Sequence, residues 1–261
     1  MDSDEWFCGS YCKQIYLGLH GHVGIKNSLG DGLSWTILRC NSGRQNLHSV
    51  QKIAHMVQCN AKLAVALTLM EECFVRMVDT RTGIDMIPHV LYNQGSMYAR
   101  LDYQGFYTVI LEKGEEILCA ASISLCRVHG TKAAELPFIA TWREHRRQGI
   151  CRRLINIIEE MLKSFHVKML VLSAIPDLVS TWVSGFDFRP IEEDERKQLD
   201  TMNLMLFPGT SLLTKSFGDG TGINKSGGEN VEHDVLGLPN GCCIPNGRGS
   251  EHFLNKLARI C

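Results

Sequence analysis

One carboxylate and a run of arginines lie close together in the middle of the chain. Glu135 stands in the largely apolar segment Ala134–Thr141. The basic side chains follow directly after it in the sequence: Arg146, Arg147, Arg152 and Arg153. A positioned carboxylate can take a proton from a substrate as a general base. Arginine is permanently charged and presents a planar fork that suits phosphate oxygens. These residue types predict an anion site that suits a phosphate group.

The elements that must position these residues are a strand, a turn and a helix. Ala134–Thr141 is apolar enough for a strand, and a basic turn ending at Gly149 follows it. The next residues repeat apolar side chains at the helical period, at Ile150, Leu154, Ile157, Ile158, Met161, Leu162 and Phe165. The polar positions Arg152, Arg153, Asn156, Glu159, Glu160 and Lys163 are predicted on the opposite face. The first N–H groups of a helix attract an anion, and glycine lets a ligand approach the backbone. An ordinary strand–helix connection with a solvated basic face fits the same residues.

The motif Arg146-x-x-Gly149-x-Cys151 resembles the Q/R-x-x-G-x-G/A signature of the GNAT superfamily of acyl-CoA N-acyltransferases, with Cys151 in place of glycine or alanine. The spacing from Glu135 to Gly149 resembles the histone acetyltransferase branch, which implies that Glu135 is the general base. The resemblance implies acetyl-CoA as co-substrate, with pantetheine held by the backbone of Phe138, Ile139 and Ala140. It places the diphosphate on the turn formed by Arg146, Arg147, Gln148, Gly149, Ile150, Cys151 and Arg152.

The surrounding pattern agrees with that fold. Residues 105–111 and 117–128 are predicted strands joined by a hairpin turn at Gly114, and residues 167–175 are a predicted buried parallel strand. We therefore expect an α/β GNAT fold: a mixed central sheet in which an antiparallel hairpin is followed by strand–helix–strand, with helices on both faces. Pro137 cannot donate to a ladder, so it predicts a bulge or an unpaired side of its strand.

The flanking segments divide the chain into three parts. Residues 1–33 are interpreted as the remnant of a PHD finger with a linker over 13–33, and residues 34–217 as the GNAT domain. The Gly-rich residues 218–261 are predicted to be disordered. Within the domain, residues 34–40 predict a strand. Asn60 predicts the N-cap of a helix that runs to about Val78, after a further helical stretch over 46–59. Residues 79–99 are expected to be irregular, and residues 203–217 to supply the last strand.

The N-terminal cysteines raise the question of a metal. Cys8 and Cys12 offer two zinc ligands, whereas a structural zinc site needs four. His20 and His22 would complete a Cys2His2 set on paper. The ending Trp6-x-Cys8 followed by Cys12 resembles the last ligand pair of a PHD finger, which implies zinc only if the upstream half is present. For this chain alone we expect no metal site, with Cys8 and Cys12 as orphan ligands.

Composition limits the classes of protein to which this chain can belong. The formal net charge is −1, so no basic excess indicates nucleic-acid binding, and a direct contact with DNA stays open. No signal peptide and no apolar run long enough for a membrane span is expected. The cysteine count is odd, at 11, and the cysteines are scattered through apolar segments, which favours reduced thiols inside a cell.

Two functions from different classes follow. The whole set resembles plant PHD-finger/GNAT proteins of the Increased DNA Methylation type. This implies an acetyl-CoA-dependent lysine N-acetyltransferase in the nucleus that acts on histone tails or another lysine-containing protein and has chromatin proteins as partners. The alternative is a chromatin-binding or scaffold protein that keeps the fold without turnover. The helix after Pro176 lacks the tyrosine that often protonates the leaving thiolate, and Cys151 departs from the signature. A nucleotide-binding protein is disfavoured because no phosphate-loop motif is present.

Overall fold

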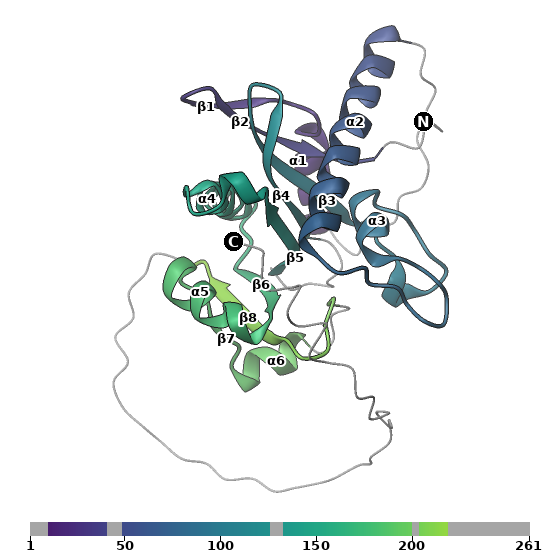
Figure 1. Ribbon diagram of the computed structural model, residues 1–261. Coiled ribbons are helices and arrows are strands. Elements are labelled where there is room, and N and C mark those ends of the chain that lie inside the picture. Colours follow the sequence, from purple (N-terminus) through teal and green to yellow (C-terminus); the bar gives the residue numbers. More distant parts are fainter. Residues whose placement is uncertain (1–9, 41–48, 126–132, 200–203, 219–261) are drawn as a thin grey trace, which may run out of the picture.

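A single mixed sheet of eight strands forms the centre of the computed structural model, which describes residues 10–40, 49–125, 133–199 and 204–218 (Figure 1). The strand order is β1-β2-β3-β4-β5-β6-β8-β7, and every neighbouring pair is antiparallel except β5 and β6. The strands are β1 Asn27–Gly30, β2 Leu33–Leu38, β3 Phe106–Lys113, β4 Glu116–Ser124, β5 Ala133–Thr141, β6 Met169–Ala174, β7 Arg189–Pro190 and β8 Ser211–Ser216.

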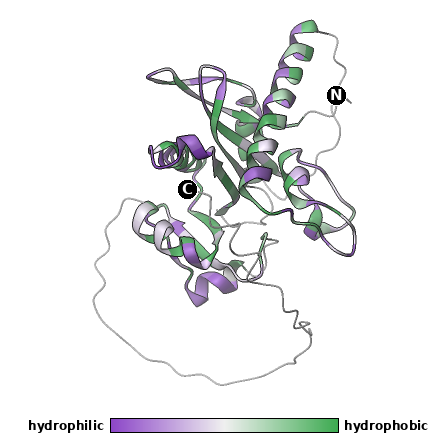
Figure 2. Ribbon diagram, viewed as in Figure 1, coloured by the Kyte–Doolittle hydropathy of each residue, from purple (hydrophilic) through white to green (hydrophobic). Residues whose placement is uncertain are grey.

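Helices cover both faces of this sheet. The α-helices are α1 Ser10–Gly21, α2 Val50–Cys73, α3 Met86–Leu91, α4 Ile150–Ser164, α5 Pro176–Phe186 and α6 Glu193–Leu199, and the 3-10 turns are η1 Ala99–Leu101 and η2 Arg143–His145. Helices α2 and α4 lie on opposite sides of the central strands (Figure 1). The most hydrophobic ribbons are those central strands, as Figure 2 shows. This arrangement confirms the predicted fold class, with the antiparallel hairpin β3–β4 followed by strand β5, helix α4 and strand β6.

The sheet opens where β5 and β6 separate. The two parallel strands pair only from Ala133 to Glu135, although β5 continues to Thr141 and β6 to Ala174. On the other side, Ser122 pairs with Phe138 and Ser124 with Glu135, so β5 holds one more residue than β4 in this interval. A bulge of this kind bends its strand. The bulge contains Pro137, as the sequence predicted.

The N-terminal segment differs from the expected linker. Residues 10–21 form α1 and residues 27–30 form β1, and Ile15 and Leu19 are buried in the main core. Cys12, Ile15 and Leu19 follow the helical spacing i, i+3, i+7, which the surrounding glycines and histidines obscured. Cys8 lies outside the described residues, and Cys12 is buried on α1. Within the described ranges, no group of three or more potential ligands could hold a metal ion.

Helix α2 is one continuous helix, so the predicted N-cap at Asn60 is wrong. Its buried side runs through Asn60 without a break, at Cys59, Leu63, Ala66, Leu69, Met70 and Cys73. Packing of that side against the sheet outweighs the weak preference of asparagine for a helix start. The helix ends at Cys73 rather than near Val78, and the segment predicted as irregular contains α3. Glu71 and Glu72 are exposed, as expected for a solvated face.

Helix α2 is also the one helix, among those in the described ranges, that is long and apolar enough to cross a membrane. That is weak evidence, because core helices of soluble proteins meet the same criteria. Leu63, Ala66 and Met70 are fully buried in the core. We therefore describe α2 as part of the folded domain.

The buried side of helix α4 differs from the predicted apolar stripe at two positions. Leu154, Ile158 and Leu162 are buried as expected, but Ile155 and Glu159 are buried with them. The Glu159 carboxylate was predicted on the polar face, yet it accepts a hydrogen bond from Lys215 Nζ at 2.7 Å. Lys215 comes from β8, so only the tertiary structure supplies the charge that makes this burial tolerable.

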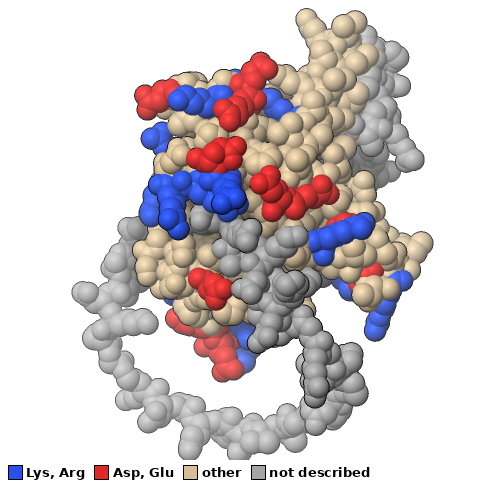
Figure 3. Space-filling model, in the orientation of Figure 1, with Lys and Arg blue, Asp and Glu red and all other residues tan. Residues whose placement is uncertain are grey.

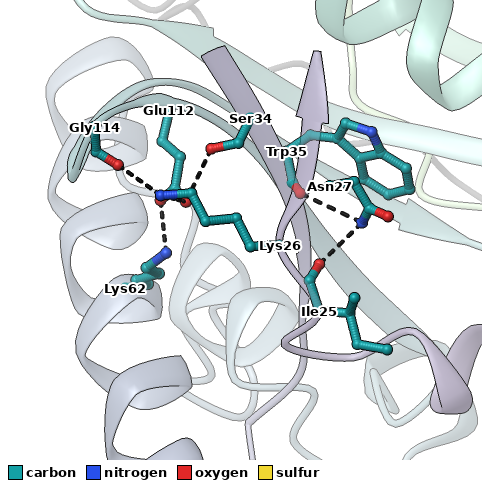
Figure 4. Close-up of polar contacts among 8 residues, drawn as sticks. All are labelled: Ile25, Lys26, Asn27, Ser34, Trp35, Lys62, Glu112 and Gly114. Atoms are coloured by element: carbon teal, nitrogen blue, oxygen red, sulfur yellow. Dashed lines mark hydrogen bonds and ion pairs between the residues drawn. The ribbon is translucent and has the colours of Figure 1, made fainter. Parts of the chain in front are cut away.

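A second buried carboxylate ties the hairpin to α2. Glu112, predicted as a turn residue, is fully buried on β3, and its Oε2 lies 2.6 Å from Lys62 Nζ (Figure 4). Its Oε1 lies 3.4 Å from both Lys26 Nζ and Ser34 Oγ. Lys26 also donates to the carbonyl of Gly114 at 2.9 Å. The cluster joins α2, the segment before β1, and strands β2 and β3.

Replacing Lys62 by alanine is therefore expected to lower the free energy of unfolding by about 3 kcal/mol, because it removes the closest counter-charge of a buried carboxylate. Chemical denaturation of the wild type and the variant measures this difference. Lys52→Ala, on the exposed part of the same helix, is the matched control and should change stability by less than about 0.5 kcal/mol. Equal stabilities of the two variants would contradict a stabilising role for the cluster.

Candidate functional site

A mostly apolar groove fills the gap between the separated strands β5 and β6. Its cavity volume is about 280 Å³. One wall is residues 136–139 of β5, and the other is residues 172–175 at the end of β6. The remaining lining residues come from the segment after α2, from α3, from α5 and from the segment before β8: Phe74, Arg76, Met77, Val78, Met86, Leu178, Trp182, Leu206, Phe207, Pro208 and Thr210.

The backbone of β5 gives this groove its polar character. Beyond Glu135, the edge of β5 that faced β6 is no longer paired with that strand. Peptide groups at such an edge seek hydrogen-bonding partners, so an extended ligand can pair with them. Phe138 and Ile139 line the groove, whereas Ala140 is fully buried beyond its lining. The three residues predicted to hold pantetheine thus lie along one strand, with the first two at the groove itself.

Glu135 stands at the closed end of the groove. It is the last β5 residue that pairs with β6, opposite Val171, and it directly precedes the first lining residue, Leu136. The residue is 6% exposed, and Oε1 accepts a hydrogen bond from the Met205 N–H at 2.5 Å. Met205 leads into Leu206, Phe207 and Pro208, which line the groove. The carboxylate therefore positions that segment, in addition to any role in proton transfer.

The basic turn is held in place by two of the side chains predicted to contact the cofactor. Arg146 turns inward, where Nε donates to the Thr141 carbonyl at 3.0 Å and Nη2 contacts Cys73 Sγ at 3.2 Å. Gln148 Nε2 donates to the carbonyl of Glu144 at 2.6 Å. Both side chains fix the path of the turn. Arg146 and Gln148 would thus support an anion site by fixing the path of the turn, and Arg146 would also add its positive charge.

The start of α4 faces open space. Gly149 is the N-cap residue in the left-handed conformation, with φ 75°, and a Cβ placed on it would meet nothing within 4 Å. Arg147 also has positive φ, at 61°. The next residues, Ile150 and Cys151, are partly buried against the core. Because first-turn N–H groups lack intrahelical partners, this turn is suited to bind an anion.

Basic side chains surround that helix start. Arg147 and Arg152 are exposed, and the Arg152 guanidinium lies over the Phe186 ring at 5.2 Å from its centroid. Lys and Arg side chains gather over the region of α4 in Figure 3. The predicted phosphate-binding residues are therefore brought together in space, at the opposite end of β5 from Glu135.

The loop after α2 forms a further wall of the groove, and Asp79 organises it. Asp79 Oδ1 accepts hydrogen bonds from the backbone N–H groups of Arg81 and Thr82 and from the Thr82 hydroxyl, and Oδ2 lies 2.6 Å from Arg100 Nη2. Chiefly because of the hydrogen bond from Arg100, the pKa of Asp79 is lowered to about 2. The carboxylate thus stays ionised throughout the neutral and mildly acidic range.

A depressed carboxyl pKa stabilises the folded state above the pKa of the unfolded chain, and the gain is lost as the pH falls through the folded value. The midpoint of thermal unfolding should therefore drop between about pH 4 and pH 2. Asp79→Asn is expected to lower the midpoint at pH 7 and to flatten this pH dependence, as followed by circular dichroism. Asp187→Asn, at an exposed carboxyl, is the control. Identical pH profiles for wild type and Asp79→Asn would contradict this role.

Sequence reasoning missed the segment before β8. Residues 203–217 were predicted as one strand, but β8 begins at Ser211, and Leu206, Phe207, Pro208 and Thr210 line the groove instead. Pro208-Gly209 is a turn signal that should have ended the strand prediction there. Ser173 and Thr210, the hydroxyl-bearing residues of the groove lining, were likewise not singled out.

Comparison with known proteins identifies relatives of the chain. A protein of Arabidopsis thaliana called Increased DNA methylation 1 is 53% identical over 218 residues, which are 84% of this chain and 18% of that protein. The chain thus spans about a fifth of the relative's length.

The similar solved structures include GCN5 of Tetrahymena, with a TM-score of 0.48 and 11% identity, covering 63% of this chain and 91% of that one. An acetyltransferase from Streptococcus agalactiae 2603 has a TM-score of 0.45 and 14% identity, covering 72% and 99%.

The family model described as "Increased DNA methylation 1, C-terminal domain" matches residues 74–216. The matched range begins directly after α2 and ends with β8. It includes β5, the basic turn and α4, and it accounts for more than half of the 261 residues. The chain belongs to the family of the Increased DNA methylation 1 C-terminal domain.

Proposed function

We propose that this chain is an acetyl-CoA-dependent N-acetyltransferase that acts on protein lysine, with histone tails as the substrate class. The observation that carries the proposal is the arrangement along β5. A buried carboxylate lies at one end of an apolar groove, and an open, basic helix start lies at the other end of the same strand. An acyl-CoA needs an extended groove for its pantetheine arm and, next along the molecule, an anion site for its diphosphate.

In this proposal the pantetheine arm pairs with the open edge of β5 beside Phe138 and Ile139. The diphosphate takes the first-turn N–H groups of α4, where Gly149 leaves room for its approach. Arg147 and Arg152 are the exposed cations of this turn. Bound acetyl-CoA would supply an acetyl group activated as a thioester.

The protein's own residues then have to prepare the nucleophile. A lysine side chain has a reference pKa of about 10.4, so it is protonated at neutral pH and cannot attack. Glu135 accepts its proton, directly or through water, with the carboxylate held in place by the Met205 N–H. The amine nitrogen forms a bond to the acetyl carbon, the carbon–sulfur bond breaks, and solvent protonates the thiolate.

The family supports a proposal for the biological setting. The relative's name refers to DNA methylation, which favours a role in chromatin, chromatin proteins as partners and a nuclear location. We also propose the boundaries 34–217 for the catalytic domain, to which α1 and β1 contribute packing. Cys8 and Cys12 would be zinc ligands only together with further ligands upstream. Residues 219–261 of the predicted disordered tail lie outside the described residues.

A second candidate function is a chromatin-binding or scaffold protein with the fold but without turnover. The specific observation in its favour is that Glu135 is engaged with the Met205 backbone and does not line the groove. The described part of α5 also offers Trp182 and no tyrosine near the groove.

Turnover decides between the two. The purified 261-residue chain is incubated with acetyl-CoA and a histone-tail peptide, and release of the CoA thiol is measured. We expect release that depends on the peptide and disappears when its lysines are replaced by arginine. Binding of acetyl-CoA without turnover, or no binding of acetyl-CoA at all, would refute the acetyltransferase and favour the scaffold.

A further inference from the structure

The side of α2 that faces away from the sheet carries an unbroken apolar stripe. Its members are all exposed and fall on one side of the helix, singly or as adjacent pairs, once in every turn: Val50, Ile53, Ala54, Val57, Ala61, Ala64, Val65 and Thr68. The exposed fractions of Val50 and Val57 are 82% and 56%. The N-terminal turns of α2 extend beyond the strands (Figure 1), and the visible face of that end has no charged side chain in Figure 3.

This stripe has the dimensions and composition of a helix–helix contact. From Val50 to Thr68 it is about 27 Å long at a rise of 1.5 Å per residue. Alanine, valine and threonine are small or β-branched, so another helix can approach closely and pack without long side chains in between. The stripe lies on the opposite side of the helix from Leu63, Ala66 and Met70, which are fully buried in the core. A partner bound there would not meet the sheet.

The charges of α2 indicate what the partner is. Its first turn holds no acidic residue, its last turn holds no basic residue, and the N-cap Ser49 makes no capping bond through its side chain. Instead, Glu71 and Glu72 lie at the C-terminal end, where the helix dipole is negative. These carboxylates continue the stripe three and four residues after Thr68. Among the residues that the structure describes, the helix therefore has negative charge at its negative end and neither an acidic first turn nor a side-chain cap at its positive end.

A second copy bound in the antiparallel direction would balance the charge at both ends of α2 at once. When the stripes of two copies pair in opposite directions, Val50 of one copy lies near Thr68 of the other. The carboxylates of Glu71 and Glu72 then lie beside the positive helix start of the partner copy, once at each end of the contact. The same geometry places the two domains on opposite outer sides of the helix pair. A parallel pair would instead bring like charges together.

We propose that two copies of this chain associate through an antiparallel α2–α2 contact. One copy weighs 29.3 kDa, so sedimentation equilibrium of the full chain should show twice this mass, with the dimer fraction rising with concentration. Val57→Glu places a charge at the middle of the stripe and is expected to give a monomer. Val183→Glu adds the same charge on an exposed position of α5 and should leave the dimer unchanged.

Two further variants test the direction of the contact. Glu71→Gln combined with Glu72→Gln should weaken dimerisation about tenfold, because the carboxylate–dipole contacts are lost at both ends. With a short thiol cross-linker, Ala61→Cys near the centre should cross-link to its own symmetry mate. Val50→Cys at the end should not, because its mate is at the far end of the stripe. Circular dichroism confirms that each variant is folded.

Four results would overturn the proposal. The first is a monomer at all concentrations up to about 100 µM, which would leave a different protein as the occupant of the stripe. The second is a dimer that survives Val57→Glu, and the third is cross-linking at Val50→Cys but not at Ala61→Cys. The fourth is a monomer that floats with phosphatidylcholine vesicles and loses this behaviour in Val57→Glu, which would assign the stripe to a lipid surface. None of these measurements depends on acetyl transfer, so they are independent of the proposed activity.

Discussion

Glu135→Gln is expected to lower turnover on a lysine-containing histone-tail peptide by about 10²–10⁴-fold, while acetyl-CoA binding stays unchanged. Glutamine has nearly the same shape as glutamate, but its amide cannot act as a base at the pH of the assay. Its side-chain oxygen can still accept the hydrogen bond that Met205 N–H now gives to Oε1. The segment that lines the groove should therefore stay in place, and the loss isolates proton transfer from positioning.

The pH profile distinguishes a missing base from a damaged site. As the pH rises towards the pKa of lysine, more free amine is present and a base is needed less. The rate of Glu135→Gln should therefore recover in part with increasing pH, and steady-state kinetics from pH 7 to about pH 9.5 measures this. Glu193→Gln, an exposed carboxylate on α6, should behave as wild type. A Glu135→Gln rate equal to that of the wild type would remove Glu135 from the mechanism.

Glu135→Ala tests the second role of this residue, which is to hold the segment before β8 in place. Alanine offers no acceptor to the Met205 N–H, so the segment from Leu206 to Pro208 loses its anchor at the closed end of the groove. Acetyl-CoA affinity and thermal stability should then fall together with turnover. If Glu135→Ala and Glu135→Gln bind acetyl-CoA equally well, the contact with Met205 does not position the groove.

Gly149→Asp is expected to weaken acetyl-CoA binding about 100-fold or more. The new carboxylate stands at the helix start and repels the diphosphate that would approach there. The positive φ of 75° costs about 1–2 kcal/mol for a residue with a side chain, which lowers the stability of the free and the bound protein alike. Because a Cβ at this position meets nothing within 4 Å, the substitution should not disturb the packing of the protein. Isothermal titration calorimetry measures the change in affinity.

The chain offers a matched control for this variant. Gly30 has a similar conformation, with φ 84°, and equally open surroundings, but it ends β1 and lies neither at the basic turn nor in the lining of the groove. Gly30→Asp should therefore carry a similar backbone cost and retain affinity for acetyl-CoA. Gly149→Ala separates the backbone cost from the charge. Equal affinities of Gly149→Asp and Gly30→Asp would refute the assignment of the diphosphate to the start of α4.

Those features of the fold that depend on short stretches of chain could be predicted from the sequence. The apolar period after Gly149 placed α4, the turn at Gly114 placed the hairpin, and Pro137 marked the bulge where β5 leaves β6. Each depends on local backbone conformation, because helical period, positive φ and a missing N–H act within a few residues. The strand–turn–helix unit with its glycine was therefore predictable before its surroundings were known.

Other features were decided only by contacts between distant parts of the chain. Glu112 and Glu159 looked like surface carboxylates, and both are buried because Lys62 and Lys215 reach them from other elements. Asn60 continues a helix because Leu63 and its neighbours pack against the sheet. The groove owes its far wall to residues 204–210, which the chain brings back 70 residues after Glu135 and fixes through Met205. Burial of a charge and the lining of a cavity depend on which partners arrive in space, and no local pattern in the sequence contains that information.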